Sequence, residues 1–557
     1  MKKTDRIFPL LAIFVLLCQL AAFILLQSKG GMGGLAAAVA LCLILWLGKD
    51  SLKKHWRSGL AVGAALMLLA ILAVVLYGMR TGRLPGNSMW LRWQYWQASA
   101  AMIADHWLTG VGGHNFSQYY PRYMNGAAPE VVSDPHCILL SIWSQWGLLG
   151  IIGFLWAAAA VFITLARPAE RNSDIAMLPV PLQPSGKRMW IWSITILSAV
   201  VLIRWAVSSL GMLTSEAERA GVFIVSFAMP AAVWFLIFII AWGALSENAK
   251  TFPANNTPLW GSVLFLGGGL LGYLAHNGID MAFTQPGVGT CFWATAAAAI
   301  SIKRISGGQK DTVFSLKKAS GILAACLVLA AAAGLWILVI FPFNRAYGKM
   351  KQAQSQALVA ANLREAYKEG LVPDFSAERW KFTRQQALSL AQAAGQINRL
   401  DPEASDFAGG LLGSQWRQSL QAEDLQAAVQ KYQEAIRRDP AHFRYYRDLA
   451  RLYQEAAIIN SREKAEYQRQ AAGYLEQALQ RYPVKSELLI EYGRLMVELQ
   501  EKEKALASFD QAIAIENAFL SQQRAMWGEA AETPWRLRPE LRKYAETQIE
   551  ILRKEFR

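Results

Sequence analysis

The sequence predicts an all-α membrane protein in which a bundle of about nine transmembrane helices precedes a water-soluble domain of helical repeats. Of the 557 residues, 54% are apolar and 17% are charged, whereas a soluble domain usually carries about 25% charged residues. Long apolar runs fill residues 1–343, and Glu, Lys, Arg and Gln become frequent in residues 344–557. This change predicts one domain boundary between residues 343 and 344.

Nine apolar runs account for the predicted spans, because about 20 residues are needed to cross the hydrocarbon core. The first run follows the start MKKTDR without a convincing cleavage site, so we expect it to remain as a spanning helix. The expected spans are Ile7–Leu26, Gly33–Leu47, Gly59–Gly78, Cys137–Leu165, Met189–Leu210, Gly221–Gly243, Leu259–His276, Gly287–Ile302 and Ser320–Phe341.

The positions of the basic residues predict the orientation. Short loops with many Lys and Arg lie on the cytoplasmic side of a membrane, and Lys2, Lys53, Lys54 and Arg57 fall there if the N-terminus is cytoplasmic. Nine spans then place the long loop 79–136 and the C-terminal domain outside the cytoplasm. The net charge of +15 is explained by this anchoring, so we expect membrane lipids as partners and no nucleic acid.

Three similar windows recur in the C-terminal part. Each places a small residue, Ala435, Ala478 or Ala512, on a helix before an expected break, and the last two are 34 residues apart. The windows are Tyr432–Pro440, Tyr474–Pro483 and Phe509–Asn517. They resemble tetratricopeptide repeats, with a degenerate earlier unit ending at Leu400–Pro402. Such repeats stack into a solenoid whose concave surface binds proteins or peptides; the alternative is a structural cap without a ligand.

The outer loop 79–136 gathers the residues that suggest chemistry. Arg92 opens a helix-like stretch, DHWLTGVG at residues 105–112 is a glycine-rich turn, and His136 stands directly before an apolar run with Gly147 after ten intervening residues. These features resemble the superfamily of O-antigen ligases and Wzy-type polymerases, as do Ser28-Lys29-Gly30-Gly31 and the segment Leu274–Asp280. The resemblance covers residues 23–302.

Two departures from that family concern the start of the chain and its first motif. Lys29 stands where the family usually has Arg, and Lys lacks the bidentate fork that Arg presents to phosphate. Family members usually have several more helices before this motif, whereas one run precedes it here. We therefore expect N-terminal helices of the family to be missing from this chain, which leaves an inactive truncated ligase as one alternative.

The resemblance implies a GT-C-like glycosyltransferase in the bacterial cytoplasmic (inner) membrane. It would transfer a glycan from an undecaprenyl-pyrophosphate-linked donor to an acceptor hydroxyl on lipid A-core, a glycan or a protein, with the repeats in the periplasm. The loop has no DxD pair and its acids are scattered, so neither a metal nor a cofactor is expected. Direct displacement by the acceptor would invert the anomeric centre.

The resemblance and the side-chain chemistry together suggest roles for a few residues. Arg92 would bind the pyrophosphate and stabilise the leaving group through paired charge-assisted hydrogen bonds, with Lys29 as a second contact. His136 would be the general base. The glycines of the structural motif are Gly110, Gly112 and Gly147, and the backbone amides of the turn can approach phosphate.

Other interpretations of the same residues remain open. An Arg in this loop can simply grip lipid headgroups, and a His can cap a membrane helix. The motifs do not separate a ligase from a polymerase or a protein glycosyltransferase. A different class is a non-catalytic membrane scaffold whose repeats recruit envelope proteins.

Overall fold

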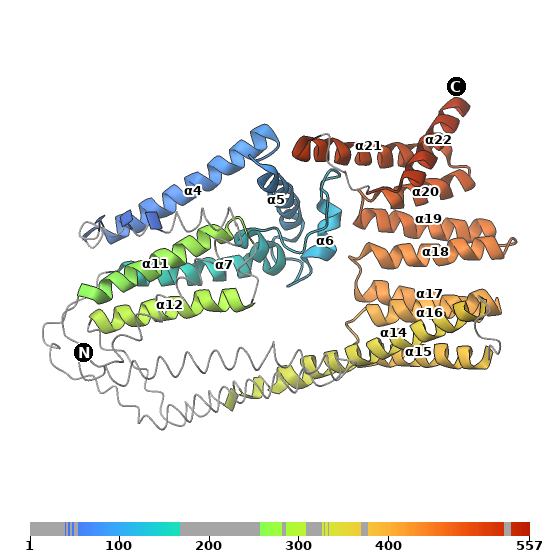
Figure 1. Ribbon diagram of the computed structural model, residues 1–557, viewed down its shortest axis with the longest axis horizontal. Helices are drawn as coiled ribbons and strands as arrows, with labels where there is room; N and C mark the ends of the chain where they lie inside the picture. The colour runs from blue at the N-terminus through green and yellow to red at the C-terminus, as the bar shows by residue number, and fades with distance from the viewer. Residues whose placement is uncertain are drawn as a thin grey trace.

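The computed structural model describes residues 54–167, 257–280, 286–307, 333–368, 377–528 and 536–556, together with isolated residues within 39–48 and 326–331. Within these ranges the secondary structure is helical and no strand is present. The apolar helices lie at one end of the molecule and the repeats at the other (Figure 1). The predicted all-α class is therefore confirmed for the described part of the chain.

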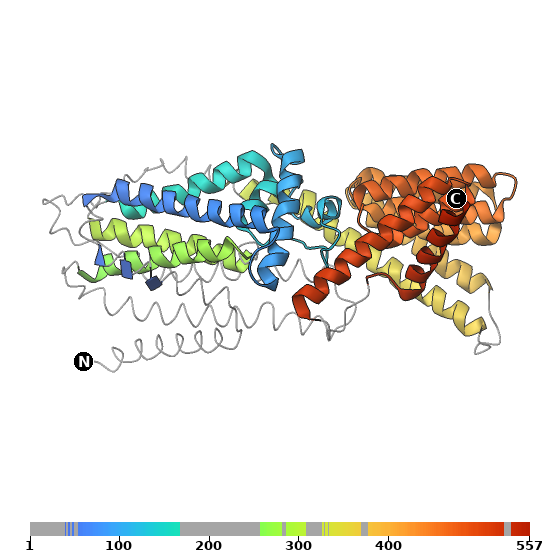
Figure 2. The same ribbon diagram turned by 90° about the horizontal axis from the view of Figure 1, so that it is seen from above.

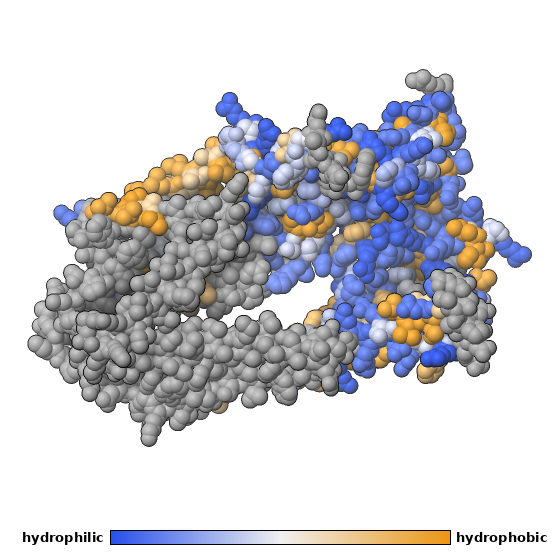
Figure 3. Space-filling view, in the orientation of Figure 1, coloured by the Kyte–Doolittle hydropathy of each residue, from blue (hydrophilic) through white to orange (hydrophobic). Residues whose placement is uncertain are grey.

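Among the described residues, four helices pack together in the apolar part: α4 (Trp56–Thr81), α7 (Ile138–Ala166), α11 (Thr257–Asn277) and α12 (Pro286–Gly307). They lie side by side in both views (Figures 1 and 2), and α7 contacts each of the other three. Leu270, Phe292 and Val161 are buried where α7, α11 and α12 meet. The outer surface of α4 is strongly apolar (Figure 3), as expected for a helix that faces lipid.

Three helices among the described residues are long and apolar enough to cross a membrane: Trp56–Thr81, Ile138–Ala166 and Leu329–Ala366. These correspond to the expected spans Gly59–Gly78, Cys137–Leu165 and Ser320–Phe341. Four further expected spans lie mostly or wholly outside the described residues: Ile7–Leu26, Gly33–Leu47, Met189–Leu210 and Gly221–Gly243. The number nine therefore stays a prediction.

The loop between α4 and α7 contains two helices, α5 (Asn87–His106) and α6 (Phe116–Tyr123). The chain leaves α4 through Gly82 and Gly86, both with positive φ of 71° and 82°, a conformation that favours glycine. Gly78 lets α5 fold back on α4, because a Cβ there would lie 2.8 Å from the Trp93 ring. Arg92, expected to open this helix, lies more than one turn inside α5.

The last apolar segment continues without a loop into the repeats. The π-helix η4 (Trp336–Ile340) runs directly into α14 (Phe341–Lys368). The predicted boundary between residues 343 and 344 therefore falls inside continuous helical backbone. A helical junction of this kind transmits orientation from membrane to repeats more directly than a flexible linker does.

The repeat region consists of antiparallel helix pairs that stack on one another (Figure 1). After α14 these are α15 (Ala377–Ile397), α16 (Glu403–Ser419), α17 (Ala422–Arg438), α18 (Phe443–Ile459), α19 (Lys464–Arg481), α20 (Ser486–Glu498), α21 (Lys502–Trp527) and α22 (Pro539–Glu555). Their surface is mostly hydrophilic (Figure 3). The helical-repeat prediction is thus confirmed as an architecture.

Small residues allow the helices of each pair to pack closely, as the sequence predicted. Ala435, Ala478 and Ala512 are all fully buried, and a Cβ on Gly493 would lie 2.7 Å from the Phe509 ring. One detail of the prediction was wrong. The window ending at Asn517 does not precede a break, because α21 continues to Trp527 and its end packs against the loop helix α5.

The loop and the repeats share one hydrophobic core. Gln94 and Gln522 form a buried reciprocal amide pair, with N···O distances of 2.6 and 3.3 Å, and Asn87 Nδ2 donates to the Met526 carbonyl at 2.6 Å. The buried side chains of this core include Tyr95, Met102, Phe116, Tyr120 and Met124 from the loop and Leu475, Tyr482 and Ile515 from the repeats. The repeats therefore hold the loop in place.

Arg536 adds a polar connection to this contact. Its Nη1 donates to the Gly126 and Ala128 carbonyls, each at 2.8 Å, and its Nη2 donates to the Val484 carbonyl at 3.0 Å. One guanidinium thus joins the extended segment after α6 to the turn between α19 and α20. Arg is suited to this role because its five donors have a fixed planar geometry.

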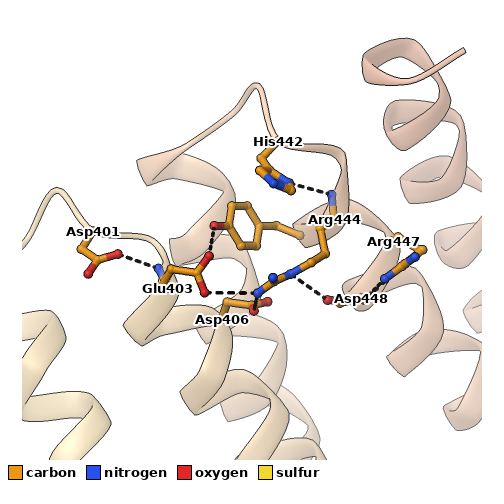
Figure 4. Close-up of polar contacts among 8 residues, drawn as sticks. Asp401, Glu403, Asp406, His442, Arg444, Arg447 and Asp448 are labelled. Carbon is orange, nitrogen blue, oxygen red and sulfur yellow. Dashed lines mark hydrogen bonds and ion pairs between the residues drawn. The ribbon is translucent and has the colours of Figure 1, made fainter. Parts of the chain in front are cut away.

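An ion-pair cluster joins two consecutive repeats farther from the loop (Figure 4). Arg444 on α18 contacts Asp406 at 2.6 Å and Glu403 at 3.3 Å, both on α16, and Asp448 at 3.7 Å on its own helix. Tyr445 also donates to Glu403 at 3.3 Å. Because these groups bond to one another across the repeat interface, the cluster is explained as a packing contact between repeats.

Candidate functional site

The glycine-rich turn of the loop lies directly on a kink in α7. The kink is at Gly147, with φ 66° and ψ −163°, a combination that essentially only glycine adopts. A Cβ on Gly147 would lie 2.2 Å from the Leu108 carbonyl oxygen, and one on Gly110 would lie 2.5 Å from Gln145. The two glycine motifs noted in the sequence therefore meet, and each needs glycine because the other backbone is so close.

Backbone hydrogen bonds fix the turn to the kinked helix. The amides of Val111 and Gly112 donate to the Ser144 and Gln145 carbonyls at 2.8 and 2.9 Å, and Leu148 donates back to Leu108 at 3.1 Å. Two amides of the turn that we expected to approach phosphate, those of Val111 and Gly112, are therefore used to hold α7. These hydrogen bonds give the turn a role in positioning the start of α7.

His136 occupies a constrained turn just before α7. Its φ is 54°, a left-handed conformation that is uncommon for a non-glycine residue. Its backbone N–H donates to Asp134 Oδ1 at 2.9 Å, and the other carboxylate oxygen of Asp134 accepts from Ser141 Oγ at 2.5 Å. Asp134 thus connects the turn to the first helical residues of α7 and determines where the imidazole lies.

The α5 helix brings Arg92 and His136 to the same place. The imidazole packs on the Tyr95 ring with centroids 5.7 Å apart, and Trp96 Nε1 donates to the Pro135 carbonyl at 3.1 Å. Arg92 and Tyr95 are three residues apart and lie on the same face of α5. The sequence-predicted pair, 44 residues apart in the chain, is therefore brought together by one helix face.

The surroundings of His136 favour its neutral form. Burial is the main cause that lowers the pKa of His136, and the positive charge of Arg92 lowers it further. Asp134, Asp280 and Glu130 act in the opposite direction without reversing the shift. The Nδ1 atom is buried and has no hydrogen-bond partner in the described part of the chain. A neutral imidazole with an available nitrogen can accept a proton.

Arg92 is held by its own helix. Its Nη1 donates to the hydroxyl and the carbonyl of Ser88, one turn earlier. Its Nε is buried and makes no hydrogen bond among the described residues. A buried donor of a charged group that lacks a partner is suited to bind an anion, because leaving it unsatisfied is costly.

The end of α11 also reaches this site. Asp280 forms an ion pair with His276, with Nε2 and the carboxylate 3.2 Å apart, and Asn277 is fully buried. The negative charge of Asp280 acts on the pKa of both His136 and Asp134. The segment Leu274–Asp280, singled out in the sequence, is thus near the imidazole.

Sequence analysis missed Asp134, Tyr95 and Glu130. Tyr95 donates its hydroxyl to Glu130 at 3.1 Å, which fixes the ring that supports His136. Asp134 stood two residues before His136 in the Asp-Pro-His triplet, a spacing at which Asp commonly accepts from a backbone N–H. That spacing was a usable signal, whereas nothing local indicated that Glu130 would meet Tyr95.

Lys29, predicted as a second phosphate contact, lies outside the described residues. The described part of the chain contains no group of three or more His, Cys, Asp or Glu side chains arranged to hold a metal ion. The site is thus characterised here by Arg92, His136 and the residues that position them.

Comparisons with known proteins agree with the two motifs of this site. Residues 13–155 match the model of the Wzy_C family, described as O-Antigen ligase; the match includes both Arg92 and His136. Over 36% of its length the chain is similar to a thermophilic TPR protein of Thermus thermophilus, 99% of which is covered, with 20% identity and a TM-score of 0.21. No curated protein matches. Residues 13–155 are therefore similar to the Wzy_C family of O-antigen ligases, and this match covers about a quarter of the chain.

Proposed function

We propose that the protein transfers a glycan from an undecaprenyl-pyrophosphate-linked donor to an acceptor hydroxyl at the outer face of the bacterial inner membrane. The observation that carries the proposal is the pairing of Arg92 with His136. The half-buried Arg92 side chain, whose buried Nε makes no hydrogen bond among the described residues, lies near an imidazole whose pKa is lowered by burial and by Arg92. Arg92 is suited to bind an anion, and His136 is suited to accept a proton.

The chemistry follows from these two groups. The acceptor hydroxyl loses its proton to the neutral His136 imidazole as its oxygen forms a bond to the anomeric carbon of the donor. The bond between that carbon and the pyrophosphate oxygen breaks, and the leaving pyrophosphate keeps the electron pair. Arg92 stabilises the developing negative charge through charge-assisted hydrogen bonds. General-base catalysis of this kind typically contributes about 10²- to 10⁴-fold.

The contact between the repeats and the loop supports the proposal that both lie on the same side of the membrane. Gln94 and Gln522 are bonded, and one core includes side chains from α5, α6, α19 and α21. We propose the periplasm for both parts, because the positive charges of the short loops predict a cytoplasmic N-terminus. There the donor would be lipid-linked, and the repeats would bind a protein or peptide.

Matched histidine variants test the catalytic proposal. His136 and His114 both have left-handed backbone conformations, with φ of 54° and 65°, and Asn tolerates that conformation well. We expect His136→Asn to reduce glycan transfer about 10²-fold or more in a strain that depends on this protein. His114→Asn should retain transfer, because His114 contacts Gln145 through its backbone N–H, which the substitution keeps.

The products distinguish the variants of the function. Loss of lipid A-linked polymer indicates a ligase, single-repeat glycans indicate a polymerase, and loss of protein-linked glycan indicates a protein glycosyltransferase. Normal transfer by His136→Asn would refute the catalytic role and favour the non-catalytic scaffold.

A further inference from the structure

A cleft of about 490 Å³ opens between the loop and the repeats, at some distance from His136. Its loop wall comes from the end of α5 and from α6, and its repeat wall comes from α19 and the turn at Pro440 and Ala441. The volume lies within the range of about 300–1,000 Å³ that is usual for small-molecule sites, and such sites often lie between domains.

Two arginines line this cleft from its two walls, Arg122 from α6 and Arg481 from α19. Arg481 donates to the backbone carbonyls of Pro440 and Gln477 at 2.8 and 2.9 Å and lies over the Tyr446 ring. No carboxylate among the described residues pairs with it. Arg122 forms a long, exposed ion pair with Asp105, at 3.9 Å, and lies over the Tyr123 ring. The cleft is therefore positively charged and suited to an anion.

The remaining side chains of the cleft are suited to a sugar. Gln118 and Gln480 line its two walls, and a carboxamide offers both donors and an acceptor to hydroxyl groups. Tyr119 and His106 contribute aromatic rings in edge-to-face contact, 5.3 Å apart. The Nε2 atom of His106 is buried and makes no hydrogen bond within the described part of the chain, so a ligand hydroxyl can satisfy it.

We infer that this cleft binds an anionic sugar, carrying a carboxylate or a phosphate, in a part of the acceptor glycan remote from the reacting hydroxyl. His106 lies 14 residues after Arg92 on α5, which corresponds to about 21 Å along the helix axis. That separation makes the cleft a second subsite and not an extension of the pyrophosphate site. The inference rests on the proposed function, since it assigns the ligand to the acceptor.

Direct binding to the purified full-length protein in detergent tests the inference. The probes are trigalacturonate, its neutral counterpart trigalactose, inorganic phosphate and a tetraglutamate peptide, measured by calorimetric titration. We expect trigalacturonate to bind, to weaken as salt is raised, and to bind at least about tenfold more tightly than trigalactose or the peptide. Competition by inorganic phosphate would support binding of phosphorylated as well as carboxylated sugars. Binding of trigalacturonate without such competition would support carboxylated sugars as the ligands.

Two variants locate the binding, and a third is the control. Arg122→Gln changes a mostly exposed side chain and should lower trigalacturonate affinity about tenfold, as should Arg481→Gln. Arg494→Gln is matched to Arg481→Gln, because Arg494 lies over the Tyr544 ring at the same 4.1 Å and does not line the cleft. It should leave binding unchanged.

The outcome separates this inference from the catalytic proposal. His136→Asn should reduce transfer about 10²-fold or more and leave trigalacturonate binding intact, whereas the cleft variants should weaken binding. The inference is overturned by unchanged affinity in Arg122→Gln and Arg481→Gln, by equal binding of trigalactose or the tetraglutamate peptide, or by no binding of any probe.

Discussion

Replacement of Gly147 by Ala should disrupt the site without touching a reactive group. The backbone at φ 66° and ψ −163° costs a non-glycine residue about 1–3 kcal/mol. The new methyl would lie 2.2 Å from the Leu108 oxygen and 2.6 Å from Thr109, so the turn must move. Loss of one of the three turn-to-helix hydrogen bonds adds about 1 kcal/mol. The expected destabilisation is about 2–4 kcal/mol.

Gly153 provides the matched control on the same helix. A Cβ there meets nothing within 4 Å, and Ala is preferred over Gly in a helix by about 0.5–1 kcal/mol. Thermal unfolding of the detergent-solubilised protein should therefore show a lower Tm for Gly147→Ala and an equal or higher Tm for Gly153→Ala. Glycan transfer should fall only in the first. Equal stability of the two variants would refute the argument that close backbone contact requires Gly147.

Three further changes test the repeats and the site. Arg536→Met removes hydrogen bonds to three carbonyls, so local stability of the loop after α6 should fall by about 2–3 kcal/mol, measured as faster amide hydrogen exchange; unchanged exchange would contradict the contact. Arg444→Met leaves Asp406 without its cation and should cost about 1 kcal/mol at pH 7, since the pair is partly exposed. Burial already raises the pKa of Asp406, so this loss should shrink as pH falls and the carboxyl is protonated; a pH-independent loss would contradict it. Because the pKa of His136 is lowered, transfer should persist below the ordinary His pKa of about 6.5 and fall only as the imidazole gains a proton. Arg92→Gln removes a positive charge that lowers this pKa, so the acid limb of the pH–rate profile should move to higher pH. An unchanged acid limb would exclude electrostatic coupling between Arg92 and His136.

The sequence was most informative where a physical constraint is local. Apolar runs of about 20 residues indicated α4 and α7, since the length needed to cross a bilayer is fixed. Buried Ala435, Ala478 and Ala512 revealed the repeats, because close helix packing needs a small residue. Gly110 and Gly147 were singled out separately, and the structure supplies the reason that connects them: each backbone occupies the space where the other's Cβ would lie.

The parts that sequence analysis missed depend on contacts between distant segments. The Gly110–Gly113 turn resembles a phosphate-binding loop in composition, and only the positions of Ser144 and Gln145 show that the amides of Val111 and Gly112 are occupied. The partnership of Tyr95 with Glu130 has no local pattern. The extension of α21 beyond Asn517 likewise depends on a tertiary contact, because its last turns pack against α5.

The shared core changes what the repeats can be. A repeat domain that only recruited a partner would need no contact with the loop beyond its covalent connection. Here Tyr482 and Ile515 of the repeats are buried together with Tyr120 and Met124 of the loop. The same α5 helix carries Arg92 near one end and His106 at the other. Any ligand that shifts the repeats against α6 therefore also acts on the helix that holds Arg92 close to His136. In this arrangement the repeats and the loop form one packed unit, so a change in the repeats can reach the residues around His136.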